Sequence, residues 1–250
     1  MDEITVVIPT SVLPSHPSLE IIEETLATIR VHLPTSEIIL QIDGLRDEQA
    51  DRKADYDEYK TRILWNCLHH PDYKNILPVV FDKHSHQSTM MRETIDLIKT
   101  PLILYVEGDA PLTPDMSIDW QKCIDFIING EANTIRFHHE GVIPREHEGL
   151  MLGEKDGFMR TVQWSQRPHL SSVLYYAQCV LPTLKKDYFI EDTYHGTVMN
   201  DWHDYGKIGW NKHRLWIYYP NPDNIKRSYH LDGRNGHRKY TSDDESWGLV

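Results

Sequence analysis

The first 140 residues alternate between short apolar runs and longer stretches whose apolar residues recur with helical spacing. The β-rich runs occupy residues 4–9, 37–42, 76–81, 102–106 and 132–138. Between the first two runs, Ile22, Leu26, Ile29 and Leu33 follow one another at spacings of four, three and four, which places them on one face of a helix. The alternation predicts a mostly parallel central sheet with right-handed crossovers and helices on both faces.

The pattern changes after about residue 141. Strand-like runs follow at residues 158–164, 171–177 and 213–220, and a helix is expected to start near Glu191. The chain contains no internal repeat and no low-complexity linker. We therefore expect one α/β domain over residues 1–250, with a Rossmann-like parallel sheet first and a small mixed β/α half at the C-terminal end.

Composition narrows the class of protein. The net charge is −12, from 38 acidic and 26 basic residues, so a broad electrostatic grip on nucleic acid is not expected, although residues 226–239 form a local basic segment. No apolar run reaches 18 residues, and the N-terminus leads into a strand without a signal-peptide pattern. Three widely spaced cysteines suit reduced thiols. We expect a cytoplasmic protein without a membrane span.

Acidic residues follow the predicted strands. Glu107, Gly108 and Asp109 end the run 102–106, and Asp43 ends the second run. Ligands of open α/β sheets bind at the carboxyl ends of the strands, and paired carboxylates suit hard divalent cations. These acids predict a site in which a cation joins the protein to a phosphate-bearing ligand, with a polar turn as the plainer alternative.

Glycine-rich phosphate loops are absent from the sequence. No GxGxxG follows a strand and no GxxxxGK[ST] occurs, which argues against a dinucleotide fold and a P-loop. Metal and side chains must then hold any bound phosphate.

Other candidate residues lie in the second half. Glu191 and Asp192 open the predicted helix, where they could provide a general base or simply stabilise the helix start. His230 could bind metal or phosphate, although a lone histidine is more often structural. Arg167 and His169, in the segment SQRPHL, suit a phosphate or a sugar acid as well as they suit a salt-bridged loop.

In order, these segments resemble the GT-A fold glycosyltransferases, most closely the large inverting family 2. TVVIPT (5–10) resembles the family's first strand, which implies that Pro9 and Thr10 lie where the chain meets the nucleotide. Asp43 matches the acid after the second strand, which implies a contact with the base. The resemblance is firm over residues 4–112 and looser up to 232.

Residues 84–109 resemble the family's N-x-G-x-x-x-A-R-N segment and the D-x-D motif that follows it. Arg92 falls on the family arginine, and Asp109 falls on the acid that binds the metal. Glu107 replaces the first acid of the motif, which still allows a ribose or metal contact. Gln87 and Ser88 stand where the family has a glycine.

The resemblance also covers two later positions. Glu191 and Asp192 match the E-D pair that carries the catalytic base, which we expect to be Asp192. His230 falls where many such enzymes complete the metal and diphosphate site. No Q-x-x-R-W motif occurs, which argues against a processive polymerase, and SQRPHL has no counterpart in the family pattern.

The resemblance implies an enzyme that uses Mn²⁺ or Mg²⁺ to transfer a sugar, with inversion, from a nucleoside-diphosphate sugar to an acceptor hydroxyl. Residues 1–112 would bind the nucleotide sugar, residues 113–225 the acceptor, and residues 226–250 would close the site. Arg92 and Arg167 are candidate contacts to the diphosphate or the acceptor. The acceptor could be a glycan, a small molecule, a protein or a hydroxylated base in DNA.

Two alternatives stay open at this point. A nucleotidyltransferase can share such a sheet, but its first strand is usually followed by a glycine-rich basic loop, and SVLPSHPS (11–18) has no glycine, lysine or arginine. A protein that binds nucleotide or sugar without turnover is the second alternative.

Overall fold

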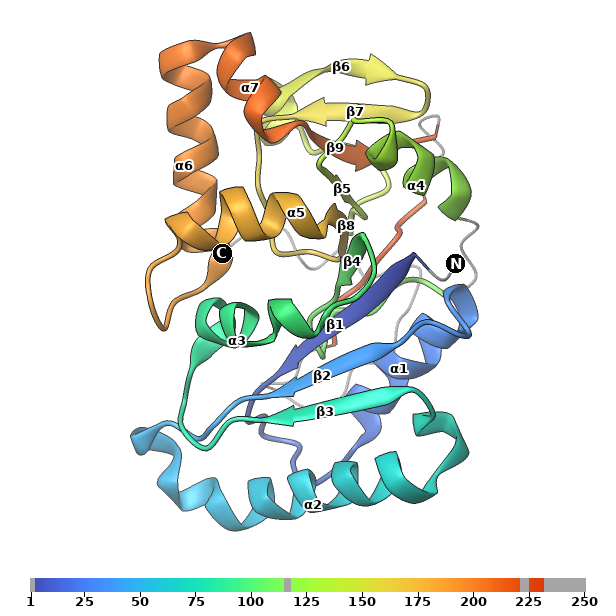
Figure 1. Ribbon diagram of the computed structural model, residues 1–250, viewed down its shortest axis with the longest axis vertical. Coiled ribbons are helices and arrows are strands. Elements are labelled where there is room, and N and C mark those ends of the chain that lie inside the picture. The colour runs from blue at the N-terminus through green and yellow to red at the C-terminus, as the bar shows by residue number, and fades with distance from the viewer. Residues whose placement is uncertain (1–2, 115–117, 221–224, 232–250) are drawn as a thin grey trace.

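The computed structural model describes residues 3–114, 118–220 and 225–231. These residues form a single α/β unit around a nine-stranded sheet, with the strand order β3-β2-β1-β4-β8-β5-β9-β7-β6 (Figure 1). Part of the predicted closing tail, residues 232–250, lies outside the described residues.

The first four strands form the parallel half of the sheet. They are β1 (Ile4–Thr10), β2 (Ile38–Ile42), β3 (Ile76–Val80) and β4 (Leu102–Tyr105). The central strand β1 pairs in parallel with β2 on one side and β4 on the other. Because both faces of β1 are covered, all seven of its residues are buried, which explains its continuous apolar run. The predicted parallel sheet is confirmed here.

The second half of the sheet is mixed. Strand β8 (His169–Ser172) lies antiparallel between β4 and β5 (Thr134–Arg136). Strand β9 (Leu215–Tyr218) runs parallel to β5, and the hairpin of β6 (Met151–Lys155) and β7 (Phe158–Thr161) completes the edge. A strand from later in the chain, β8, is therefore inserted between β4 and β5.

The prediction of a strand over residues 171–177 is wrong beyond Ser172, where β8 ends and a helix begins. The Ser172 hydroxyl accepts a hydrogen bond from the Tyr175 backbone N–H at 3.4 Å, which caps the short helix α5 (Val173–Tyr175). The helical course continues as a π-helical turn, Tyr176–Val180. A local cap thus overrides the β propensity of the segment SSVLYYA.

Helices cover both faces of the sheet (Figure 1). One face packs against α1 (Glu20–His32), α2 (Lys53–His69) and α4 (Trp120–Ile128). The other face packs against α3 (His86–Thr94), α5 and α6 (Ile190–Tyr205), with α7 (Lys207–His213) next to α6. Alternate residues of β1 serve the two cores: Val6 belongs to the first and Val7 to the second.

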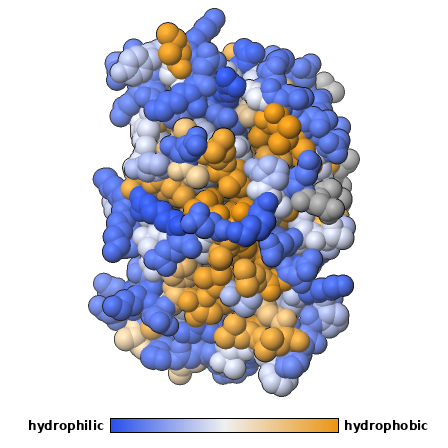
Figure 2. Space-filling model, viewed as in Figure 1, coloured by the Kyte–Doolittle hydropathy of each residue, from blue (hydrophilic) through white to orange (hydrophobic). Residues whose placement is uncertain are grey.

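The edge strand β3 leaves apolar surface uncovered. Leu77 and Val80 are each 41% exposed, and Figure 2 shows apolar side chains gathered in the lower part of this face, where β3 lies. No helix among the described residues combines the length and the apolar character needed to cross a bilayer.

Candidate active site

The carboxyl ends of β1, β2 and β4 meet at one edge of the sheet. The turn after β4 is held against β1, because the Gly108 N–H donates to the Pro9 carbonyl at 3.0 Å and the Thr25 hydroxyl donates to the Gly108 carbonyl at 2.8 Å. A Cβ atom at position 108 would lie 3.2 Å from the Pro9 oxygen, so glycine permits this close approach. The flanking acids, Glu107 and Asp109, are thereby fixed beside the end of β1.

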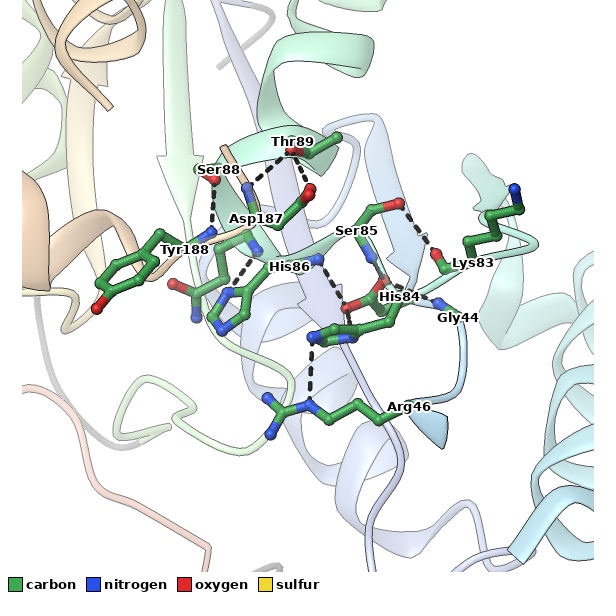
Figure 3. A network of polar contacts seen from close by, with 12 residues as sticks. Gly44, Arg46, Lys83, His84, Ser85, His86, Ser88, Thr89, Asp187 and Tyr188 are labelled. Atoms are coloured by element: carbon green, nitrogen blue, oxygen red, sulfur yellow. Dashed lines mark hydrogen bonds and ion pairs between the residues drawn. The ribbon is translucent and has the colours of Figure 1, made fainter. Parts of the chain in front are cut away.

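Asp43 organises the loop that starts α3. Its buried carboxylate accepts backbone hydrogen bonds from Gly44, Ser85 and His86 at 2.7–3.0 Å, and the His84 ring lies 2.8 Å from its Oδ2 (Figure 3). Both carboxylate oxygens are thus engaged by the protein itself. The predicted contact with a nucleotide base would have to be made beside this loop rather than by free carboxylate oxygens.

Thr10 ends β1 at the same edge. Its hydroxyl lies 3.1 Å from the Tyr59 hydroxyl of α2, and its carbonyl accepts the Asp43 N–H at 2.9 Å. Asp82, by contrast, is exposed after the edge strand β3. The structure therefore gathers Pro9, Thr10, Asp43 and the acids after β4 at this edge of the sheet.

Glu107 occupies an unfavourable place for a negative charge. Burial, the neighbouring Asp109 and, to a smaller extent, Glu191 raise the pKa of its carboxyl group to about 8. The hydrogen bond that Gln87 donates to Glu107 acts in the opposite direction and lowers this pKa. A cation placed between these acids would reverse the shift. Two carboxyl groups that disfavour each other's charge therefore lie together at this edge.

His230 is brought to Asp109 by the last described segment. Residues 225–231 run back along the turn after β4: the Tyr229 N–H donates to the Pro111 carbonyl at 3.1 Å, and the Leu231 N–H donates to the Asp109 carbonyl at 2.7 Å. As a result, His230 Nε2 lies 3.6 Å from Asp109 Oδ2, although 121 positions separate the two residues in sequence.

The described residues contain no group of three or more metal-binding side chains. Mg²⁺ in nucleotide sites is usually held by one or two carboxylates, waters and the substrate's phosphates, and not by a complete protein cage. Asp109 and His230 are partly exposed, at 24% and 35% of their side-chain surfaces, and provide an oxygen and a nitrogen donor. This donor set fits a cation that arrives with a nucleotide.

The second acidic pair lies at the start of α6. The Glu191 carboxylate accepts the Gln166 backbone N–H at 2.8 Å, which holds the SQRPHL segment against the helix. Asp192 is exposed. Burial lowers the pKa of the His86 ring, and the nearby Asp192 acts in the opposite direction on this pKa. Asp192 therefore lies close to the loop that Asp43 organises.

Two residues that were predicted to contact the ligands, Arg92 and Arg167, bind other parts of the protein in this structure. The Arg92 guanidinium donates to the backbone carbonyls of Leu181 and Leu184, which ties α3 to the turn before α6. Arg167 forms a two-pronged ion pair with Glu140, with Nη2 3.0 Å from Oε1. The ion pair and the hydrogen bond from His138 hold the pKa of Glu140 well below its usual range. Both arginines hold the fold together in this structure.

His169 is a core residue of β8. Its ring is fully buried and stacks on Tyr105, while Nδ1 lies 2.8 Å from the Arg167 carbonyl and Nε2 lies 2.7 Å from the Tyr176 hydroxyl. Burial lowers the pKa of the ring to about 4. With both nitrogens engaged, the ring offers no atom to a substrate, so the expected substrate contact does not fit this geometry.

Two residues that sequence reasoning did not select lie among the acids. Gln87 takes the place of the expected glycine and donates to Glu107. Gln166 follows the buried Trp164 and is itself 5% exposed. The departure from the family pattern at position 87 was a visible signal, whereas nothing in SQRPHL distinguished Gln166 from a loop residue.

No protein-family model and no curated protein match this chain, whereas several solved structures are similar to it. S. aureus TarS (residues 1–349) with UDP-GlcNAc matches with a TM-score of 0.57 at 13% identity, over 96% of this chain and 62% of TarS. The mannosyltransferase PcManGT from Pyrobaculum calidifontis, with GDP-Man and Mn²⁺, matches with a TM-score of 0.51 at 13% identity, over 86% of this chain and 56% of that one.

GalNAc-T7 with UDP, GalNAc and Mn²⁺ matches with a TM-score of 0.50 at 12% identity, over 92% of this chain and 44% of that one. The present chain thus spans less than two thirds of the length of each of these proteins. Identities this low carry the fold alone. On that ground, together with the strand order and the site at the end of β4, the protein has the GT-A fold predicted from its sequence.

Proposed function

We propose that the protein is a metal-dependent glycosyltransferase that moves a sugar from a nucleoside-diphosphate donor to an acceptor hydroxyl with inversion at the anomeric carbon. The observation that carries the proposal is the meeting of Asp109 and His230, 3.6 Å apart, beside a carboxyl group of raised pKa at the end of β4. Structures of the same fold that hold UDP-GlcNAc, or GDP-Man with Mn²⁺, support the choice of donor class.

Asp109 and His230 would hold Mn²⁺ or Mg²⁺, with Glu107 next to them. When bound, the cation neutralises negative charge on the departing diphosphate. Pro9, Thr10 and the loop on Asp43 would border the nucleotide. In this division of labour, residues 1–112 serve the donor and residues 113–225 serve the acceptor.

Asp192 would act as the general base. It is exposed at the first turn of α6 and can accept the proton of an acceptor hydroxyl as that oxygen attacks the anomeric carbon. Glu191 stays bound to the Gln166 N–H and keeps the helix start in place. In-line attack from the side opposite the diphosphate inverts the anomeric configuration.

The test is a transfer assay with nucleotide sugars, Mn²⁺ and four acceptor sets: glycans, small polyols, peptides and DNA that contains hydroxymethylated bases. A transferase of this kind releases a nucleoside diphosphate and adds one sugar mass to an acceptor, with the anomeric configuration inverted by NMR. Release of pyrophosphate from nucleoside triphosphates would instead identify a nucleotidyltransferase. Tight nucleotide binding without any product would identify a binding protein.

A further inference from the structure

The connection between β7 and β8, residues 163–167, joins the sheet to the helix that carries the second acidic pair. At one end, Gln163 accepts two hydrogen bonds from Arg136, the last residue of β5: Nη2 donates to the side-chain oxygen at 3.1 Å and Nη1 to the backbone carbonyl at 3.5 Å. Near the other end, the Gln166 N–H donates to Glu191 in the first turn of α6. The start of α6 is therefore linked to β5 through this connection.

Arg136 is a buried cation that contacts no acid. Its side chain is on a residue that is 4% exposed, and it forms no ion pair with a described residue. The Nε atom has no hydrogen-bond partner among the described residues either. A buried guanidinium is costly unless an opposite charge lies near it. The place of Arg136 in the fold therefore depends on a negative charge in its surroundings.

Glu191 is the acid available to balance Arg136. Burial lowers the pKa of the guanidinium to about 9 and Arg167 adds to the fall, whereas Glu191 and Glu140 oppose it, so the group is charged at pH 7. Glu140 already forms its two-pronged ion pair with Arg167. Two arginines and two glutamates thus balance one another in this cluster, and Glu191 is the member left for Arg136.

The histidines around Arg136 add little charge to this balance. Burial lowers the pKa of His138 and of His169 to about 4, and it also lowers the pKa of His195, which lies one turn after Glu191 on α6. The charge of Arg136 is a further cause in each case. All three rings are therefore mainly neutral at pH 7, and they cannot replace Arg136 as the cation next to Glu191.

We propose that Arg136 is a positioning residue for the acidic pair that opens α6: it balances the charge of Glu191 and, through residues 163–167, fixes the turn that carries Asp192. The proposal rests on the proposed function, in which Asp192 is the general base. It also gives a role to the connection, which has no counterpart in the family pattern. Arg136 acts through its neighbours and needs no contact with a substrate.

The test is a double-substitution cycle of Arg136→Met and Glu191→Gln, with Arg145→Met as the matched control at an exposed position. Single-turnover transfer and calorimetry in Mn²⁺ measure the rate and the dissociation constant of the nucleoside diphosphate. Arg136→Met leaves Glu191 without its countercharge, so transfer should fall about tenfold or more while the dissociation constant stays the same. Arg136→Lys keeps the charge and should lose less, and Arg145→Met should match the wild type.

The Glu191→Gln background distinguishes charge balance from general support of the fold. There the charge that Arg136 balances is gone, so adding Arg136→Met should lower the rate at most about threefold, the share of the lost bonds to Gln163. An equal loss from Arg136→Met in both backgrounds would show that Arg136 only supports the local fold and would overturn the proposal.

Melting temperatures without ligand give a readout that does not depend on catalysis. Each single substitution leaves one charge without its partner, whereas the double variant removes both charges, so the double variant should melt above each single variant. A double variant that melts no higher than Arg136→Met would overturn the pairing of Arg136 with Glu191. Absence of transfer by the wild type from every donor would instead overturn the proposed function, and the melting temperatures would still test the pairing.

Discussion

The two acidic pairs of this protein have almost the same composition and very different surroundings. Glu107 and Asp109 follow a buried strand, where burial and mutual repulsion raise the pKa of Glu107 to about 8. Glu191 and Asp192 open a helix, and Asp192 stands exposed there. Two charges in the first pair disfavour each other, which a bound cation would relieve, whereas Asp192 in the second pair is exposed where an acceptor hydroxyl can reach it.

Substitution of the proposed base should have the largest effect. Asp192→Asn removes the proton acceptor without changing the size of the side chain, so transfer should fall about 10²–10⁴-fold while the donor's dissociation constant stays the same. Single-turnover kinetics and calorimetry measure the two quantities separately. Asp204→Asn, an exposed change on the same helix, is the control and should keep full activity. A fully active Asp192→Asn would move the base to another residue.

Removal of the proposed cation ligands should have the next largest effect. Asp109→Asn takes away a charge beside the cation and should weaken Mn²⁺ binding in the presence of nucleotide about 100-fold, because a close charge pair is worth about 1 kcal/mol in water and about 4 kcal/mol at an effective dielectric of about 20, and this partly exposed site lies between these limits. His230→Ala removes a neutral donor and should cost about tenfold. Mn²⁺ titration followed by electron paramagnetic resonance measures both. Equal affinities in the wild type and both variants would place the cation elsewhere.

Glu107 should give the ligand-free protein a characteristic pH dependence. Its pKa is raised on folding, so between about pH 4.5 and 8 the unfolded chain releases a proton that the folded protein keeps. The free energy of unfolding should therefore fall as the pH rises through this window, by an amount on the order of a few kcal/mol. Glu107→Gln should flatten the curve and be the more stable protein at pH 8, as urea titrations at several pH values would reveal. A wild-type curve equal to that of the variant would contradict the raised pKa.

The smallest effect should come from Glu191→Gln. The amide oxygen of glutamine can still accept the Gln166 N–H, so the helix start should keep its place and transfer should fall by about tenfold or less. Removal of one negative charge should also lower the pKa of Glu107 slightly, since Glu191 contributes to its rise. A loss of activity as large as that of Asp192→Asn would show that Glu191, and not Asp192, is the general base.

The parallel half of the fold could be predicted because its strands are continuous apolar runs separated by amphipathic helices. The mixed half could be predicted only in part: the runs 158–164 and 213–220 contain β7 and β9, but two other features could not be predicted, for physical reasons. The position of β8 between β4 and β5 depends on long-range pairing, for which the local sequence gives no signal. The hairpin strand β6 has the sequence MLGEK and exposed positions, so it lacks the apolar pattern of a strand.

The residues of the candidate site could likewise be predicted only in part from the sequence. The acids after β4 could be selected from a strand that ends in carboxylates, and His230 was added by the family resemblance. Arg92 was selected by the family resemblance and His169 by its residue type and segment, and both are engaged by the protein's own carbonyl and hydroxyl oxygens. Gln166 was missed, since only the fold brings its backbone N–H to the Glu191 carboxylate.

The most direct test of the account is the melting temperature of the wild-type protein with each nucleoside diphosphate, in Mn²⁺, in Mg²⁺ and in EDTA. Ligand at 100 times its dissociation constant stabilises a protein by about 2.7 kcal/mol, which is a shift of several degrees for a domain of this size. We predict such a shift with one nucleotide in the presence of a divalent cation, lost in EDTA and in Asp109→Asn. A shift that persists in EDTA, or no shift with any nucleotide, would contradict a cation-dependent donor site at the end of β4.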